Sequence, residues 1–190
     1  MLIDNDDIKK AIDTLRRGGL ILYPTDTIWG IGCDATNSEA VKRVFQLKQR
    51  ADSKALITLV GSEASLERIV ENVPEVAWQL IDATDRPTTI VYDHGTGVAP
   101  ELLADDGSIA VRMTTEPFSR ELCNRFRRPL VSTSANISGA PSPLCYSEIS
   151  QEIIDGVDYV CRSRRDEAPS KSASMIIKIQ DNGVFKILRS

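Results

Sequence analysis

The sequence predicts an α/β fold in which a twisted, open, mixed sheet is flanked by helices. Short apolar runs typical of buried strands alternate along the chain with amphipathic stretches typical of helices. The last two runs flank Asp181-Asn182-Gly183, a sequence typical of a β-hairpin, so at least one strand pair is antiparallel. A chain of 190 residues has room for a full hydrophobic core, and we expect residues 1–190 to form a single domain.

The N-terminal segment predicts one helix followed by one strand. Asp4 or Asp6 can cap a helix that ends at Gly18-Gly19. The apolar run over 20–23 then indicates a buried strand, which Pro24 ends.

The rest of the chain continues this alternation. Ser38, Ser62 and Pro74 each stand where a helix can begin. Helices are predicted over 39–49, 62–70, 74–83, 117–126 and 147–154; strands over 55–60, 88–92, 108–113, 129–134, 157–161, 174–179 and 184–188; and loops over 94–108, 137–143 and 162–172.

The composition is that of a globular protein. Hydrophobic residues make up 42% of the chain and charged residues 26%. With a formal net charge of −4, the protein as a whole has no positive field that would attract nucleic acid. A local basic patch is still compatible with this charge. The acidic N-terminus is unlike a signal peptide, and no apolar run approaches the roughly 20 residues of a membrane helix. We therefore expect a cytoplasmic protein without membrane contact.

Histidine and cysteine usage argues against metal and thiol chemistry. His94 is the only histidine, and we expect it in an exposed loop. No two cysteines have the C-x-x-C spacing, so no metal site made of protein side chains is predicted. P-loop and Rossmann glycine motifs are also absent. Each of the four cysteines is expected as a small residue in or near the core: Cys33, Cys123, Cys145 and Cys161.

A group of cations follows the second predicted helix. Lys48 continues the apolar face that includes Val44 and Phe45, and Arg50 and Lys54 lie just beyond the helix end. Three cations so close together suit a polyanion such as a triphosphate. A lysine that snorkels over the edge of the core, beside two solvated surface charges, is the alternative.

Small polar side chains mark the end of the strand over 129–134. Ser132, Ser134 and Asn136 share one face, where they can line a pocket at the carboxyl end of the strand. A polar strand exit with an asparagine turn is an equally open interpretation.

An arginine within a strand and two loops complete the candidates. Ser108 and Arg112 share one face of the strand over 108–113, and a buried Arg112 needs an anionic partner, either a ligand or a carboxylate such as Glu116. The loop over 23–30 carries hydroxyls and Asp26, which binds a ligand or caps local backbone. The other loop carries three arginines that form either a solvated face or a phosphate contact: Arg162, Arg164 and Arg165.

Four of these segments, in this order, resemble the motifs of one family. They are Y-P-T-D-T-x-x-G-x-G at 23–32, K-x-R at 48–50, A-V-R at 110–112 and S-T-S-A-N-x-S-G at 132–139. Together they are similar to the YrdC family, the L-threonylcarbamoyl-AMP synthases, over nearly the whole chain. The resemblance implies a twisted open sheet with a basic concave cleft. It also implies that L-threonine, bicarbonate and ATP become threonylcarbamoyl-AMP and pyrophosphate.

The same resemblance implies partners and site residues. The product feeds the threonylcarbamoyladenosine modification of tRNA, so a downstream tRNA-modifying transferase complex is implied, and magnesium is expected to arrive with the nucleotide. Lys48 and Arg50 are implied as catalytic groups that face the phosphates. The implied ATP site also contains Lys54, Ser108, Ser134, Asn136, Ser142 and Arg189, and the implied threonine site contains Thr27, Arg112, Ser132 and Ser174.

The chain departs from the family pattern in three places. Pro169-Ser170 and Ser174-Met175 are both candidates for the family's P-S-T segment, and Ser190 follows Arg189 where the family has Pro-Gly. The third departure is a loop. Residues 84–89 are T-D-R-P-T-T where the family has W-P-G-P-x-T, so the tryptophan and the glycine are missing. Two other functions therefore stay open: a module of the same fold that binds RNA or a nucleotide without synthesis, and a domain that binds only an amino acid. An RNA-binding module would need a contiguous basic surface and would bind with a steep salt dependence.

Overall fold

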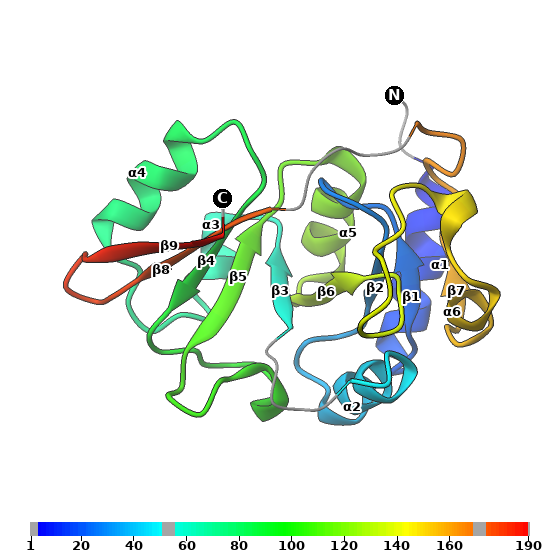
Figure 1. The fold of residues 1–190 in the computed structure, drawn as a ribbon, viewed down its shortest axis with the longest axis horizontal. Helices are drawn as coiled ribbons and strands as arrows, with labels where there is room; N and C mark the ends of the chain where they lie inside the picture. The colour runs from blue at the N-terminus through cyan, green and yellow to red at the C-terminus, as the bar shows by residue number, and fades with distance from the viewer. Residues whose placement is uncertain (1–3, 51–55, 169–173, 190) are drawn as a thin grey trace.

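Strands from the whole length of the chain meet in one mixed sheet (Figure 1). The computed structural model describes residues 4–50, 56–168 and 174–189. Its strands are β1 (Ile21–Tyr23), β2 (Gly30–Gly32), β3 (Ile57–Val60), β4 (Thr88–Tyr92), β5 (Ile109–Met113), β6 (Leu130–Ser134), β7 (Tyr159–Val160), β8 (Met175–Ile179) and β9 (Phe185–Arg189). Their order across the sheet is β7-β1-β2-β6-β3-β5-β4-β8-β9. The pairs β1/β7, β3/β5 and β4/β8 are parallel and the others are antiparallel, so the predicted mixed, open sheet is confirmed.

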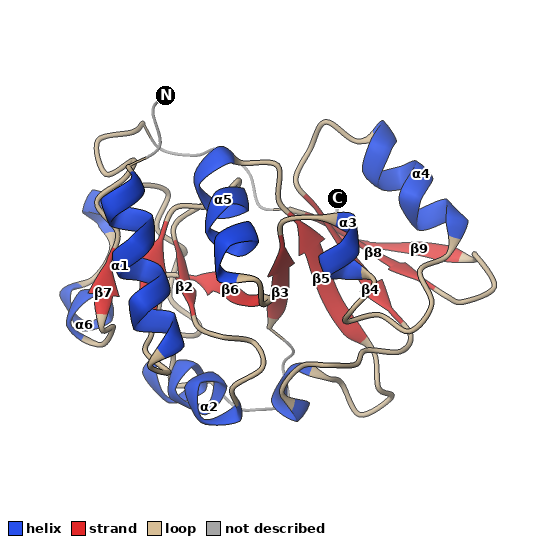
Figure 2. Cartoon of the chain, turned by 180° about the vertical axis from the view of Figure 1, so that it is seen from behind, coloured by secondary structure: helices blue, strands red, loops and turns tan. Residues whose placement is uncertain are grey.

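The helices of the described ranges are α1 (Asn5–Arg16), α2 (Ser38–Leu47), α3 (Glu63–Leu66), α4 (Glu75–Ala83), α5 (Pro117–Phe126) and α6 (Gln151–Asp155). Short 3₁₀ turns lie at Pro100–Leu102 and Tyr146–Glu148. Figure 2 shows α1 and α5 side by side against one face of the sheet, whereas α4 lies apart from them at the β8–β9 end. Within these ranges, none of the helices combines the length and the apolar character that crossing a membrane requires.

Side-chain caps begin three of the helices. The Asp4 carboxylate accepts hydrogen bonds from the backbone N–H groups of the first turn of α1, at 3.0 and 3.1 Å, as the sequence predicts. Glu116 caps α5 in the same way, ahead of Pro117. The predicted cap of α2 is wrong by one residue. Asn37 accepts from the N–H of the first turn, because the Ser38 hydroxyl donates instead to Glu101.

Two clusters of apolar side chains hold the helices to the sheet. The larger joins α1, α2 and α5 to β1, β2 and β6, and includes Tyr23, Phe45 and Leu122. The smaller joins α3 and α4 to β4, β5 and β8, and includes Ile90 and Ile109. Each fully buried side chain of this size contributes roughly 1.5–3 kcal/mol.

Three elements differ from the expectation. The helix expected over 147–154 is instead a 3₁₀ turn at Tyr146–Glu148 followed by α6, because Ile149 is extended between them. The strand β2 is not among the predicted elements; it begins at the last residue of the loop expected over 23–30, and Gly30 and Gly32 give no strand signal. Glycine is needed at position 32, where a Cβ would lie 2.6 Å from Cε1 of Tyr23. The helix expected over 62–70 ends at Leu66, because the chain then turns so that Val70 pairs with Gly95.

Candidate functional site

A cavity of about 270 Å³ lies over the middle of the sheet and gathers most of the residues that the sequence singles out. We call it the central cavity. Its described lining contains hydroxyl and guanidinium groups but no carboxylate, which suits an anionic ligand. Eight predicted site residues line it: Thr27, Arg50, Arg112, Ser132, Ser134, Ser142, Ser174 and Arg189.

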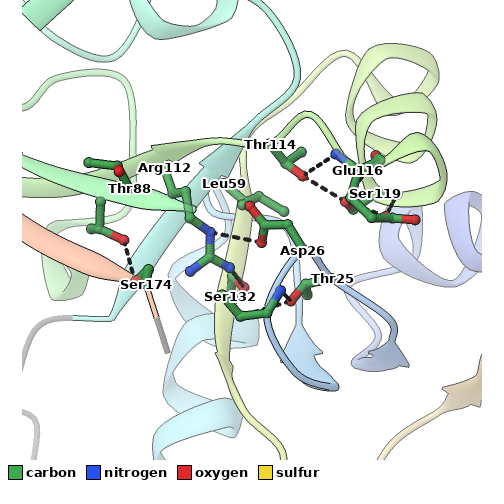
Figure 3. A network of polar contacts seen from close by, with 12 residues as sticks. Thr25, Asp26, Leu59, Thr88, Arg112, Thr114, Glu116, Ser119, Ser132 and Ser174 are labelled. Atoms are coloured by element: carbon green, nitrogen blue, oxygen red, sulfur yellow. Dashed lines mark hydrogen bonds and ion pairs between the residues drawn. The ribbon is translucent and has the colours of Figure 1, made fainter. Parts of the chain in front are cut away.

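Arg112 is held in this lining by two partners (Figure 3). Its Nε lies 3.1 Å from Oδ1 of Asp26, and the two side chains are only 4% and 8% exposed. One terminal nitrogen donates a long hydrogen bond, 3.4 Å, to Ser132 Oγ. The anionic partner that Arg112 needs is therefore Asp26 rather than Glu116. Burial raises the pKa of Asp26 above its ordinary value, although the neighbouring Arg112 opposes that shift.

The β1–β2 loop places Thr27 at the central cavity. Oγ1 of Thr25 donates to the carbonyl of Ile28 at 2.7 Å and accepts from the N–H of Thr27 at 3.1 Å, which closes a tight turn. Thr25 itself lines the cavity, although the sequence did not mark it as a site residue. Its position could have indicated this role, because Thr25 lies two residues before Thr27 in the same loop.

The end of α2 separates the two cations of the K-x-R motif. Gln49 has a left-handed φ of 50°, and the N–H of Arg50 bonds to the carbonyl of Phe45. This is a Schellman motif, which ends a helix by turning the chain sharply. As a result Lys48 belongs to the core side, whereas Arg50 lines the central cavity.

Lys48 does not line the cavity, because its ammonium group is enclosed by the β6 exit. The side chain is 2% exposed. Its Nζ donates to the carbonyl of Ser134, to the carbonyl of Asn136 at 2.7 Å and to Oδ1 of Asn136 at 3.2 Å. Burial, with a contribution from Arg50, lowers the pKa of Lys48 to about 8. Lys48 therefore fixes the turn that follows β6.

Arg189 reaches the central cavity because of a bulge in β9. Ile177 pairs with Ile187, but Ile176 pairs with Arg189, so Leu188 is an extra residue in the last strand. The shift turns Arg189 toward the side of Ile176, which lines the cavity. The guanidinium then donates to the carbonyl of Ser174 at 2.7 and 3.0 Å.

Two other predicted site residues lie outside the lining of the central cavity, and a third is not among the described residues. Ser108 precedes β5 at the end opposite Arg112, and its N–H bonds to Asp106. Asn136 holds Lys48 and donates to the carbonyl of Ala140, so it supports the cavity wall from outside the lining. Lys54 lies outside the described residues.

The remaining candidates have structural partners. Arg162 pairs with Asp4 and Asp6, Arg164 pairs with Glu116 and Glu167, and Arg165 donates to two backbone carbonyls. His94 is exposed, as expected. Three cysteines are buried, whereas Cys145 is partly exposed because it lies beside the surface turn Tyr146–Glu148. The described residues contain no group of three or more histidine, cysteine or acidic side chains that could hold a metal ion.

Comparisons with known proteins agree with these motifs. The family model Sua5_yciO_yrdC, described as "Telomere recombination", matches residues 13–190. A protein of Vibrio parahaemolyticus named threonylcarbamoyl-AMP synthase is 32% identical over 187 residues, which is 97% of this chain and 98% of the relative. A protein of the same name from Chromohalobacter salexigens is 37% identical over 146 residues, covering 76% of this chain and 78% of the relative.

Solved structures share the fold. P. abyssi Sua5 complexed with L-threonine has a TM-score of 0.81 at 28% identity; the match covers 94% of this chain and 52% of that one, so this chain spans about half its length. E. coli YciO has a TM-score of 0.81 at 23% identity and covers 98% of this chain and 90% of that one. At that identity the second likeness concerns the fold alone.

Proposed function

The chain belongs to the Sua5–YciO–YrdC family, and on that premise we propose that it is an L-threonylcarbamoyl-AMP synthase. It would join L-threonine, bicarbonate and ATP into threonylcarbamoyl-AMP and release pyrophosphate. The observation that carries this proposal is the central cavity, where three arginines and several hydroxyl groups meet with no carboxylate in the described lining. We also propose that residues 1–190 act as one domain, because the described strands share one sheet.

The threonine would bind at the Arg112 side of the cavity. Asp26 engages Nε of Arg112 and leaves the outer part of the guanidinium for the carboxylate of an amino acid. Thr27, Ser132 and Ser174 line the same cavity and supply hydroxyl groups for the amine and hydroxyl of threonine.

The triphosphate would bind at Arg50 and Arg189, with Ser134 and Ser142 beside them. Lys48 acts in this scheme as a positioning residue, because its ammonium group holds the Ser134–Asn136 turn rather than the cavity surface. Lys54 stays in the proposed ATP site, whereas Ser108 lies outside the central cavity and is not part of the site proposed here.

The chemistry needs positioning and charge neutralisation more than a strong base. The threonine amine adds to the carbon of bicarbonate, and water leaves, which gives a carbamate. A carbamate oxygen then attacks the α-phosphorus of ATP; a new P–O bond forms while the bond to the β-phosphate breaks and pyrophosphate leaves. The nucleophile is already anionic, so arginines that neutralise the phosphates supply the main stabilisation. Magnesium would be held by phosphate oxygens, since the described lining offers no carboxylate, and would add further charge neutralisation.

The test is release of pyrophosphate by the full chain. We expect it to require L-threonine, bicarbonate and ATP together. Release that is independent of threonine would contradict the proposal, and so would ATP binding without turnover, the outcome expected for a nucleotide-binding module. Direct RNA binding is a separate alternative, and its affinity would fall steeply as salt is raised.

We place the reaction upstream of a transferase complex that passes the threonylcarbamoyl group to tRNA. The mixed anhydride of a carbamate and a phosphate is labile, so a consumer of the product is expected nearby. Since the reaction consumes ATP and its product is passed on to tRNA, we propose that the protein acts in the cytoplasm.

A further inference from the structure

A second and larger cavity, of about 490 Å³, lies on the other face of β5. Val111 lines this cavity and Arg112 lines the central one, and successive residues of a strand point to opposite faces. The second cavity lies at α3, α4 and the start of α5, and we call it the α4 cavity. The synthase reaction proposed above does not use it.

The floor of the α4 cavity is apolar and contains one unpartnered hydroxyl group. Leu66, Ile81, Ile90 and Met113 form much of the floor. Tyr92 also lines the cavity and is only 2% exposed, yet its hydroxyl has no hydrogen-bond partner among the described residues. Its hydroxyl is open to the cavity and can pair with a polar atom of a ligand or with water.

One end of the α4 cavity contains two carboxylates, each paired with an arginine. Asp26 lines it, with one carboxylate oxygen on Arg112 and the other accepting no hydrogen bond from another described residue. Glu116 lies beside it but is already satisfied by Arg164 and by the first turn of α5. Arg112 compensates the charge of Asp26, Arg164 compensates that of Glu116, and Asp85 and Arg86 at the rim offset each other, so the charges around the cavity balance. The second oxygen of Asp26 is nevertheless an acceptor without a donor, and an N–H group of a ligand would satisfy it.

We propose that the α4 cavity binds a small organic ammonium compound with an apolar body. The ammonium group lies at the free oxygen of Asp26, the apolar body covers the floor, and the Tyr92 hydroxyl pairs with a polar atom of the ligand. Cavities of this volume with an apolar floor and a few convergent polar groups are typical of small-molecule sites. The raised pKa of Asp26 agrees with this placement, because a bound cation would compensate the buried charge.

The experiment is a calorimetric titration of the full chain with 2-phenylethylamine. Its matched probes are 2-phenylethanol, which lacks the charge, and 3-phenylpropionate, which reverses it. We expect 2-phenylethylamine to bind at least about 10-fold more tightly than either matched probe, which corresponds to about 1.4 kcal/mol of binding free energy. Thr84→Trp, which fills the cavity, should weaken binding by about 10-fold or more, whereas Thr96→Trp at an exposed loop position should not. Tyr92→Phe, which leaves the packing intact, should weaken it by about 2- to 10-fold.

Three results would overturn the proposal. One is equal binding of the ammonium and carboxylate probes, or no saturable binding of either. Another is wild-type affinity for 2-phenylethylamine in both the folded Thr84→Trp variant and the Tyr92→Phe variant. The last is a combination of two results: ATP abolishes the binding of 2-phenylethylamine, and the Thr84→Trp and Tyr92→Phe variants bind the amine as the wild type does. That combination would place the amine in the central cavity. None of these results bears on the synthase reaction, which is measured separately by pyrophosphate release.

Discussion

Replacing Lys48 by methionine tests how the turn after β6 is held. Methionine keeps the length and much of the volume of the side chain but removes the ammonium group. The carbonyl of Asn136 then loses its donor, whereas the Ser134 carbonyl keeps the N–H of Asn136 and Asn136 Oδ1 keeps the Ser134 hydroxyl. Since a buried acceptor without a partner costs about 1–3 kcal/mol, we expect the variant to be less stable at high pH, where Lys48 of the folded wild type is neutral and no longer carries the cost of burying a charge.

The sharper prediction concerns how the difference in unfolding free energy between the wild type and Lys48→Met changes with pH. The ordinary pKa of lysine is 10.5, and the folded protein lowers the value for Lys48 to about 8. Between these values the unfolded chain binds a proton that the folded protein has lost, so the unfolding free energy of the wild type rises with pH relative to the variant. One pKa unit corresponds to about 1.4 kcal/mol, so the gap between the two proteins should widen by about 3 kcal/mol between pH 7 and pH 10.5.

The measurement is urea unfolding of both proteins, followed by circular dichroism, at one-unit steps from pH 7 to pH 10. All other titrating groups are common to the two chains, so the difference in unfolding free energy isolates Lys48. A difference that stays flat, or that narrows as the pH rises, would refute the reasoning. A narrowing difference would mean that the three oxygens stabilise the ammonium form by more than burial destabilises it.

Three further outcomes are expected. Arg50→Met should lower pyrophosphate release by the folded protein by about 100-fold, the scale for removing one electrostatic stabiliser; an unchanged rate would remove Arg50 from the site. Arg112→Lys should raise the KM for threonine by about 10-fold or more and leave the KM for ATP unchanged. The reason is that an ammonium group cannot pair with Asp26 and also bind a carboxylate in the bidentate way that a guanidinium does. Equal rises in both KM values would contradict this. Gly32→Ala should destabilise the fold by about 1–3 kcal/mol in urea unfolding, because the new methyl group would meet the ring of Tyr23; an unchanged urea midpoint would show that the strands can shift.

Local patterns predicted most of the elements. The bounds of β4 and α5 agree with those predicted from the sequence. A run of β-branched residues marks β4, and Pro117 marks the start of α5. The central cavity also follows from local rules, since serines at alternate positions of β6 share one face. What these rules find is chemistry encoded within a few neighbouring residues.

The partners of the buried charges could not be predicted in this way. Asp26 and Arg112 are far apart in sequence, and either carboxylate near the strand could have satisfied the arginine until the loop geometry was known. The role of Lys48 depends on a left-handed Gln49, a conformation that glutamine rarely adopts and that nothing in the sequence signals. These features arise from tertiary packing rather than from propensity.

The extra residue in β9 means that strand pairing, as well as residue identity, decides where the charge of Arg189 lies. With an even pairing of the same residues, Leu188 would lie opposite Ile176 and the guanidinium would emerge on the other side of the sheet. Deleting Leu188 would remove the bulge but leave Arg189 directly after Ile187, and therefore still opposite Ile176. Loss of this one residue would keep the positive charge at the cavity, whereas a change that abolished the bulge without shortening the chain would take it away.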